Sequence, residues 1–137
     1  MIIIIIIIII IVCKCRHIQV LDVSFNRIKH FADDWTLLYH LVELNVAGND
    51  LKLLPKDINK MRCLSSLDVS DNLIDQLPDK LAKLKSLQQL NIADNIIMQW
   101  PANFVKLQSK VKACACRLVI IVSLKLGVFV QSCIVLG

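Results

Sequence analysis

Apolar and polar positions in the middle of the chain recur with a fixed period. Four asparagines mark this period: Asn26, Asn49, Asn72 and Asn95. Apolar and polar residues alternate before each asparagine, as in Leu67-Asp68-Val69, and this alternation predicts a short strand with one buried face. Three of the four periods then place a proline at the same offset, at Pro55, Pro78 and Pro101. Because proline suits the first position of a helical turn, we expect a short helical segment there.

These periods are expected to stack as structural repeats. A single repeat cannot bury its apolar face, whereas stacked neighbours bury a continuous core. The amide of the recurring asparagine can bond backbone groups where the strand turns, so stacking should align these side chains in a ladder. The organisation predicted is an apolar N-terminal segment at 1–17, four repeats at 18–40, 41–63, 64–86 and 87–109, and a basic then apolar segment at 110–137.

The full pattern, L-x-x-L-x-L-x-x-N-x-L-x-x-L-P-x-x-L-x-x-L, resembles the leucine-rich repeat family. The stretch LSSLDVSDNLIDQLPDKLAKLKS, Leu64 to Ser86, matches nearly every fixed position. The resemblance implies an α/β fold: a right-handed solenoid forming a short horseshoe arc, with parallel strands on the concave face and short helical turns on the convex face. The 23-residue length and the Leu-Pro pair resemble the intracellular subgroup typified by Ras-pathway scaffolds. The function implied is protein recognition by a cytoplasmic adaptor or scaffold in signal transduction.

In such a solenoid, binding is expected at strand positions left exposed on the concave face. Acidic side chains outnumber basic ones at these positions, where Arg27 is the single basic residue. The residues predicted to contact a partner are Asp22, Phe25, Glu43, Asn45, Asp50, Asp68, Asp71, Gln89, Asn91 and Asp94. We expect negative potential here, which favours a protein partner with a basic patch. The alternative is that short polar residues only keep an exposed sheet soluble.

Charge argues against a nucleic-acid partner. The chain has 137 residues, 56% hydrophobic, and a net charge of +5. Residues 18–109 hold ten Lys and Arg against eleven Asp and Glu, a net of 10 − 11 = −1, so the basic excess lies in the terminal segments. The repeats therefore lack the basic footprint that a phosphate backbone requires.

No catalytic residue, metal site or cofactor is predicted. His17, His30 and His40 are interpreted as falling at unrelated phases of the repeat, so the solenoid should keep them apart. No Gly-rich phosphate loop or hydrolase motif is present, so the chain is not expected to be an enzyme.

The cysteines do not follow a zinc-binding pattern. Cys13 with Cys15, and Cys114 with Cys116, have C-x-C rather than C-x-x-C spacing. Cys63 is expected to be a small buried hydrophobe. The C-terminal pair suits a degraded fifth repeat beginning at Val111, and the N-terminal pair suits lipidation at a membrane surface.

Both ends of the chain are unusual. Ile2 to Ile11 is an unbroken isoleucine run that covers only about 18 Å as a helix, with the two residues after it included, against a bilayer core of about 30 Å. The isoleucine run has two interpretations: it forms an added strand, or it arises from a simple nucleotide repeat in the gene. Leu118 to Leu136 is long enough to span a membrane, but Lys125 near its centre costs about 2.5–3.5 kcal/mol there. A β-rich cap is the other interpretation.

These ends leave two further functional hypotheses open. In the first, the chain is a membrane-anchored, receptor-like fragment held by its C-terminal apolar segment. In the second, it is a piece of a longer repeat protein.

Overall fold

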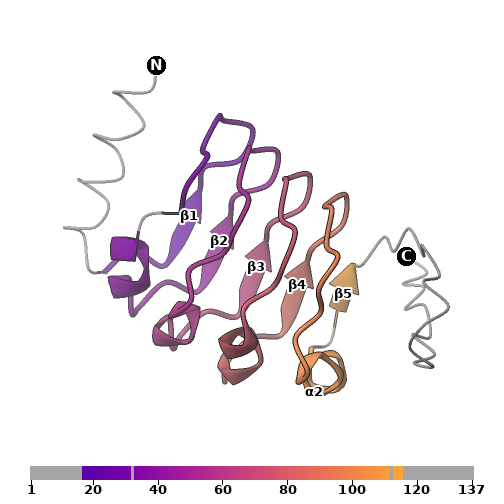
Figure 1. Cartoon of the computed structure of the whole chain (residues 1–137). Helices are drawn as coiled ribbons and strands as arrows, with labels where there is room; N and C mark the ends of the chain where they lie inside the picture. The colour runs from indigo at the N-terminus through magenta and orange to yellow at the C-terminus, as the bar shows by residue number, and fades with distance from the viewer. Residues whose placement is uncertain (1–16, 32, 112, 116–137) are drawn as a thin grey trace, which may run out of the picture.

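Each repeat contributes one three-residue strand to a single parallel sheet (Figure 1). The computed structural model describes residues 17–31, 33–111 and 113–115, so the isoleucine run and the C-terminal apolar segment lie outside the described residues. The strands follow one another in chain order across the sheet: β1 (Val20–Asp22), β2 (Glu43–Asn45), β3 (Ser66–Asp68), β4 (Gln89–Asn91) and β5 (Ala113–Ala115). This is the predicted parallel arrangement.

The sheet register follows the sequence period. Leu21, Leu44, Leu67 and Leu90 are the central residues of β1 to β4, and each pairs with the next. All four are buried, so the residue on either side of each leucine is turned toward the other face of the sheet. Leu90 pairs with Cys114, which lies one position beyond the regular period. Cys114 thus takes the fourth position of the fifth repeat predicted from Val111.

The chain returns from each strand through a helical turn. The first three turns are 3-10 helices: η1 (Asp33–Leu37), η2 (Ile58–Lys60) and η3 (Asp79–Lys83). The fourth is a seven-residue α-helix, α2 (Phe104–Lys110), and it accommodates the extra residue of that repeat.

The prolines start these turns in a different way from the one predicted. Pro78 precedes the first residue of η3 instead of occupying it. Its carbonyl oxygen accepts a hydrogen bond from the Leu81 N–H at 2.9 Å, and the carbonyl oxygens of Pro55 and Pro101 accept equivalent bonds three residues on. The proline therefore supplies the acceptor that closes the first turn.

The core is one column of buried side chains between the sheet and the returning chain. It contains every strand leucine together with buried apolar residues of the helical turns, such as Trp35, Ile58 and Leu81. The two outer repeats fill their layers with aromatic pairs, Phe31 with Trp35 and Trp100 with Phe104, whose ring centroids lie 4.6 and 4.4 Å apart. The inner repeats have leucine and isoleucine at the same offsets. Packing is therefore continuous although the side chains differ in size.

The asparagine ladder forms as expected. The Asn72 amide nitrogen donates to the carbonyl oxygens of Val69, Ser70 and Val46, and its carbonyl oxygen accepts the Leu51 N–H at 3.0 Å. Asn49 and Asn95 repeat this arrangement one layer to either side. Each amide therefore ties its own turn to the preceding repeat.

No helix among the described residues combines the length and apolar character needed to cross a bilayer.

Candidate protein-interaction site

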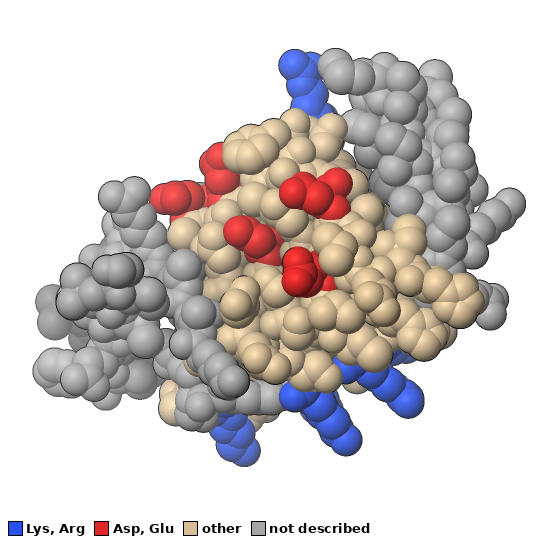
Figure 2. Space-filling model, turned by 180° about the vertical axis from the view of Figure 1, so that it is seen from behind, with Lys and Arg blue, Asp and Glu red and all other residues tan. Residues whose placement is uncertain are grey.

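The predicted site lies on the exposed side of the sheet. We call this surface the strand face and define it by the outward residues of β1 to β4: Val20, Asp22, Glu43, Asn45, Ser66, Asp68, Gln89 and Asn91. Their side chains leave the core because the middle residue of each strand is buried. Figure 2 shows acidic side chains gathered over this face, while Lys and Arg lie at its margins.

The alternating aspartates and asparagines of the strand face form hydrogen-bonded pairs. The Asn45 amide nitrogen donates to the Asp22 carboxylate at 3.0 Å, and the Asn91 amide nitrogen donates to the Asp68 carboxylate at 2.9 Å. Each pair joins one repeat to the next. The polar stripe predicted as a binding feature therefore also holds neighbouring strands together.

The same four side chains fold the turn after each strand. One oxygen of Asp22, Asn45, Asp68 and Asn91 accepts the backbone N–H two residues further on, at 2.9 to 3.2 Å. Short Asp and Asn side chains are suited to this local turn because their oxygens reach their own backbone. Sequence reasoning missed this role, although restriction of the position to Asp and Asn was the available signal.

Hydrogen bonds keep Asp22 ionised. The Ser24 side chain and its backbone N–H, with a weaker contribution from Asn45, lower the pKa of the Asp22 carboxyl below its ordinary value. The hydrogen bonds favour the charged form because a carboxylate is a better acceptor than a carboxylic acid. The strand face thus keeps this negative charge below the pH at which a free aspartate loses it.

The residues at the upper rim of the strand face adopt a left-handed backbone. Phe25, Gly48, Asp71 and Asp94 occupy the eighth position of their repeats, with φ of 53°, 64°, 52° and 51°. Glycine and aspartate tolerate this conformation, but a bulky residue rarely adopts it. Phe25 is therefore the exception, and 81% of its surface is exposed.

The Phe25 ring lies against Gly48 of the next repeat. A Cβ atom placed on Gly48 would come 2.6 Å from Phe25 Cδ1, so a larger residue at position 48 would displace the ring. The Phe25 ring is therefore an exposed aromatic surface at the rim of the strand face. The sequence showed Phe25 as a candidate contact but did not reveal its dependence on Gly48.

Nine of the ten predicted contact residues lie on the strand face or its rim. Glu43 and Gln89 are exposed on β2 and β4, and Gln89 accepts a hydrogen bond from the Ser66 hydroxyl at 3.3 Å. Asp50 does not lie with them. It follows Asn49 on the stretch that descends from the turn, and its N–H bonds the Ile28 carbonyl at 3.0 Å. Asp50 therefore lies on a different surface from the strand face.

Two further predictions are wrong. His17 and His40 were expected to lie apart, but they are separated by one repeat period in sequence, and their rings stack with centroids 5.7 Å apart. Cys63, expected to be buried, is exposed and has a free thiol. It shares the repeat phase of His40, which is also exposed. The last position of the repeat is thus a surface position. Within residues 17–31, 33–111 and 113–115, no group of three or more His, Cys, Asp or Glu is placed to hold a metal ion.

Comparisons with known proteins agree with this architecture. Residues 16–74 match the family model described as leucine rich repeat. A search of curated proteins finds no match. Among solved structures, a leucine-rich repeat protein of Leptospira interrogans has a TM-score of 0.68 and 26% identity, over 76% of this chain and 28% of that chain.

A second solved structure, the plant peptide hormone receptor RGFR1 in complex with RGF2, shares the fold. Its TM-score is 0.65 at 22% identity, over 77% of this chain and 18% of the receptor. The chain thus spans less than a third of either structure. Both structures share the solenoid fold, and the family match supports leucine-rich repeats over residues 16–74.

Proposed function

We propose that this leucine-rich repeat protein is an intracellular adaptor or scaffold in signalling that binds a protein partner on its strand face. The observation that carries the proposal is the charge of that face. Asp22, Glu43 and Asp68 lie on it, Asp71 and Asp94 lie at its rim, and no Lys or Arg is among its outward strand residues. Such a surface favours a partner with a basic patch.

The acids of the strand face and its rim differ in their hydrogen bonding. The Asp22 and Asp68 carboxylates accept bonds from their own turn and from the neighbouring repeat. No hydrogen bond or ion pair involves the side chains of Glu43, Asp71 or Asp94 among the described residues. We therefore assign recognition mainly to these three residues.

The intracellular assignment rests on the repeat length. The strands β1 to β4 follow one another at the period of the sequence, and this repeat length is typical of the intracellular subgroup that the sequence resembles. Cytoplasmic location is part of the proposal.

The test uses the full chain and a fluorescein-labelled peptide of lysines and arginines, with a glutamate peptide of the same length for comparison. The variant neutralises the three free acids: Glu43→Gln, Asp71→Asn and Asp94→Asn. Asparagine is chosen at the rim because it tolerates the left-handed backbone there. We expect about a tenfold loss of affinity for the basic peptide in fluorescence anisotropy, with wild-type binding weakened by salt.

A matched control removes the same number of charges elsewhere. Asp34→Asn, Asp75→Asn and Asp79→Asn alter acids that lie off the strand face. This control should bind the basic peptide like the wild type. Equal loss in both triple variants, or no loss in either, would show that the strand face does not recognise basic partners.

A further inference from the structure

A second exposed surface lies opposite the strand face. It is formed by the extended stretches that descend from each turn toward the next helical turn, and we call it the descending face. In Figure 1 these stretches run in front of the strands, whereas Figure 2 shows the opposite side of the molecule, which carries the strand face. The outward residues of the descending face are Arg27, Lys29, His30, Asp50, Lys52, Leu53, Leu73, Asp75, Gln76, Ile96, Met98 and Gln99.

Backbone hydrogen bonds hold the descending stretches in register. The N–H groups of Asp50, Leu73 and Ile96 donate to the preceding repeat at 3.0, 2.9 and 3.1 Å. Parallel bridges join Leu53 to Gln76 and Gln76 to Gln99. Side chains of successive repeats are therefore held at a fixed spacing, as on a sheet, and the surface is organised before any partner arrives.

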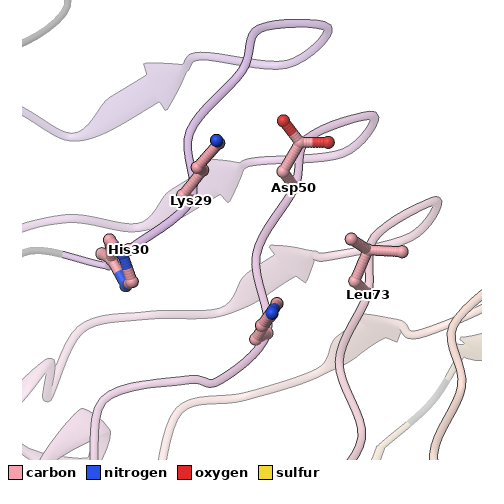
Figure 3. Close-up of a pocket in the computed structure, with 5 residues that line it drawn as sticks. Lys29, His30, Asp50 and Leu73 are labelled. Atoms are coloured by element: carbon pink, nitrogen blue, oxygen red, sulfur yellow. The ribbon is translucent and has the colours of Figure 1, made fainter.

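The first two repeats make one end of this face basic. Lys29 and Lys52 occupy the same repeat position in neighbouring repeats, and the ion pairs of the described residues join Asp57 to Lys60 and Lys80 instead. A depression of about 380 Å³ is lined by Lys29, His30, Asp50, Lys52 and Leu73. Figure 3 shows that these side chains come from three successive descending stretches. Two lysines, one histidine and one aspartate therefore line the depression.

The last two repeats make the other end apolar. Leu73 borders the depression and is 43% exposed, and Ile96 and Met98 beyond it are 51% and 81% exposed. Leu53, on the second repeat, is 50% exposed. Neighbouring exposed apolar side chains of this size mark interaction surfaces more often than scattered single ones do.

We propose that the descending face is a second binding site, which takes an extended acidic peptide segment of a partner protein. The acidic end of the peptide lies in the depression, where its carboxylates pair with Lys29 and Lys52. Its apolar end runs across the repeats over Leu73, Ile96 and Met98. Charge complementarity sets the direction of the peptide, and burial of the apolar side chains adds to the affinity.

Charge and shape favour a peptide over a bilayer or a second copy. Asp50 and Asp75 interrupt the basic groups, which leaves Arg27, Lys29 and Lys52 with an excess of only one charge when His30 is neutral. A bilayer surface is recognised by larger clusters of Lys and Arg. The depression contains the Asp50 carboxylate. It therefore suits a single extended peptide whose acidic side chains lie away from Asp50.

The test uses the full chain and a fluorescein-labelled synthetic peptide with a run of glutamates followed by a run of leucines. Lys29→Glu combined with Lys52→Glu should lower its affinity at least about tenfold in fluorescence anisotropy. Met98→Ser combined with Ile96→Ser should lower it about fivefold without changing its salt dependence, because these residues contribute apolar contacts only. Circular dichroism confirms that each variant keeps the fold.

Lys83→Glu combined with Lys85→Glu is the matched control, because both lysines are exposed and lie off this face. The control should bind like the wild type. Failure of the wild type to bind the peptide, or unchanged binding by the Lys29 and Lys52 variant, overturns the proposal. Two other results would also overturn it, if the wild type does not bind the peptide. The first is sedimentation of the wild type with phosphatidylserine vesicles, and the second is self-association in the ultracentrifuge, in each case abolished by Lys29→Glu with Lys52→Glu. None of these results bears on the strand face.

Discussion

At the scale of single residues, the repeated asparagine is the residue on which the turns depend. Asn72 is buried and makes four hydrogen bonds, three to carbonyl oxygens and one to the Leu51 N–H. Where the strand ends and the chain turns, these carbonyl and N–H groups have no partners in the sheet. Leaving such groups buried and without hydrogen bonds lowers the free energy of unfolding. Asn26, at the first repeat, is exposed, and among the described residues it bonds only two carbonyl oxygens of its own turn.

This difference gives a matched pair of substitutions. Asn72→Ala should lower the free energy of unfolding by about 2–4 kcal/mol, because it leaves one N–H and several carbonyl groups unsatisfied in the core. Asn26→Ala should cost less than about 1 kcal/mol, because water can replace its two bonds. Urea denaturation followed by circular dichroism measures both. Equal costs would mean that the ladder contributes nothing beyond the local turn.

The left-handed residues show how far single positions could be predicted. Asp71 and Asp94 suit a positive φ, and Gly48 suits it best, so the eighth position resembled a turn position in three repeats. Phe25 departs from this pattern, because a bulky side chain rarely adopts a positive φ. Only the structure shows the Phe25 ring against Gly48, since that contact joins two turns that pairing of the strands brings together.

At the scale of elements, an ion-pair cluster joins two helical turns. Asp57, next to η2, pairs with Lys60 at 2.9 Å and with Lys80 of η3. Hydrogen bonds from Lys80 and Lys60, with the attraction of both charges, lower the pKa of the Asp57 carboxyl from 3.8 to about 2. The cluster is solvent-exposed, so its contribution to stability is small and sensitive to salt.

The pH dependence of this cluster follows from the direction of the shift. Because the folded pKa lies below the ordinary value, ionised Asp57 stabilises the fold above pH 3.8, and this contribution is lost as the pH falls to about 2. Asp57→Asn should therefore lower the free energy of unfolding near neutral pH and lower it less at about pH 2, where the folded-state carboxyl is half protonated. Urea denaturation at both pH values measures the difference.

Lys80 provides the partner control for this cluster. Lys80→Gln should reproduce part of the Asp57→Asn effect, and the double variant should cost less than the sum of the two. Lys83→Gln, on the same helical turn, should leave the pH dependence unchanged. A pH-independent cost of Asp57→Asn would rule out the ion pairs as its cause.

At the scale of the whole molecule, stability comes from contacts between neighbouring repeats. Each strand pairs only with the strands beside it, and the core is a column with no closing contact between its ends within the described residues. Solenoids of this kind gain stability from each interface between repeats. An inner repeat takes part in two such interfaces. Within the part of the chain that the structure describes, β1 pairs with β2 alone.

Core substitutions test this view directly. Leu67 and Leu21 occupy the same position in β3 and β1, with 1% and 8% of their surface exposed. Leu67→Ala should cost about 3–5 kcal/mol and Leu21→Ala about 2–3 kcal/mol, because the cavity at position 67 is enclosed on both sides. Urea denaturation measures each. A larger cost at position 21 than at position 67 would contradict nearest-neighbour stabilisation.

The period of the sequence predicted the strands, the buried leucines and the asparagine ladder, whereas the parallel order of the strands was implied by the family resemblance. These features follow from side-chain type at fixed spacing, and stacking repeats the same local choice in every layer. The same period places His17 and His40 in neighbouring layers, and the structure shows that their rings stack there.

Tertiary structure alone decided which polar residues remain available for binding. Asp22, Asp68 and Glu43 look equivalent as exposed acids, yet the two aspartates are engaged by neighbouring strands and their own turns, whereas Glu43 is free. Asp50 and Lys52 meet Lys29 and Leu73 only because three descending stretches align in space. Spacing along the chain determines which residues share a layer, but contacts between layers determine what each polar group bonds and which face it occupies.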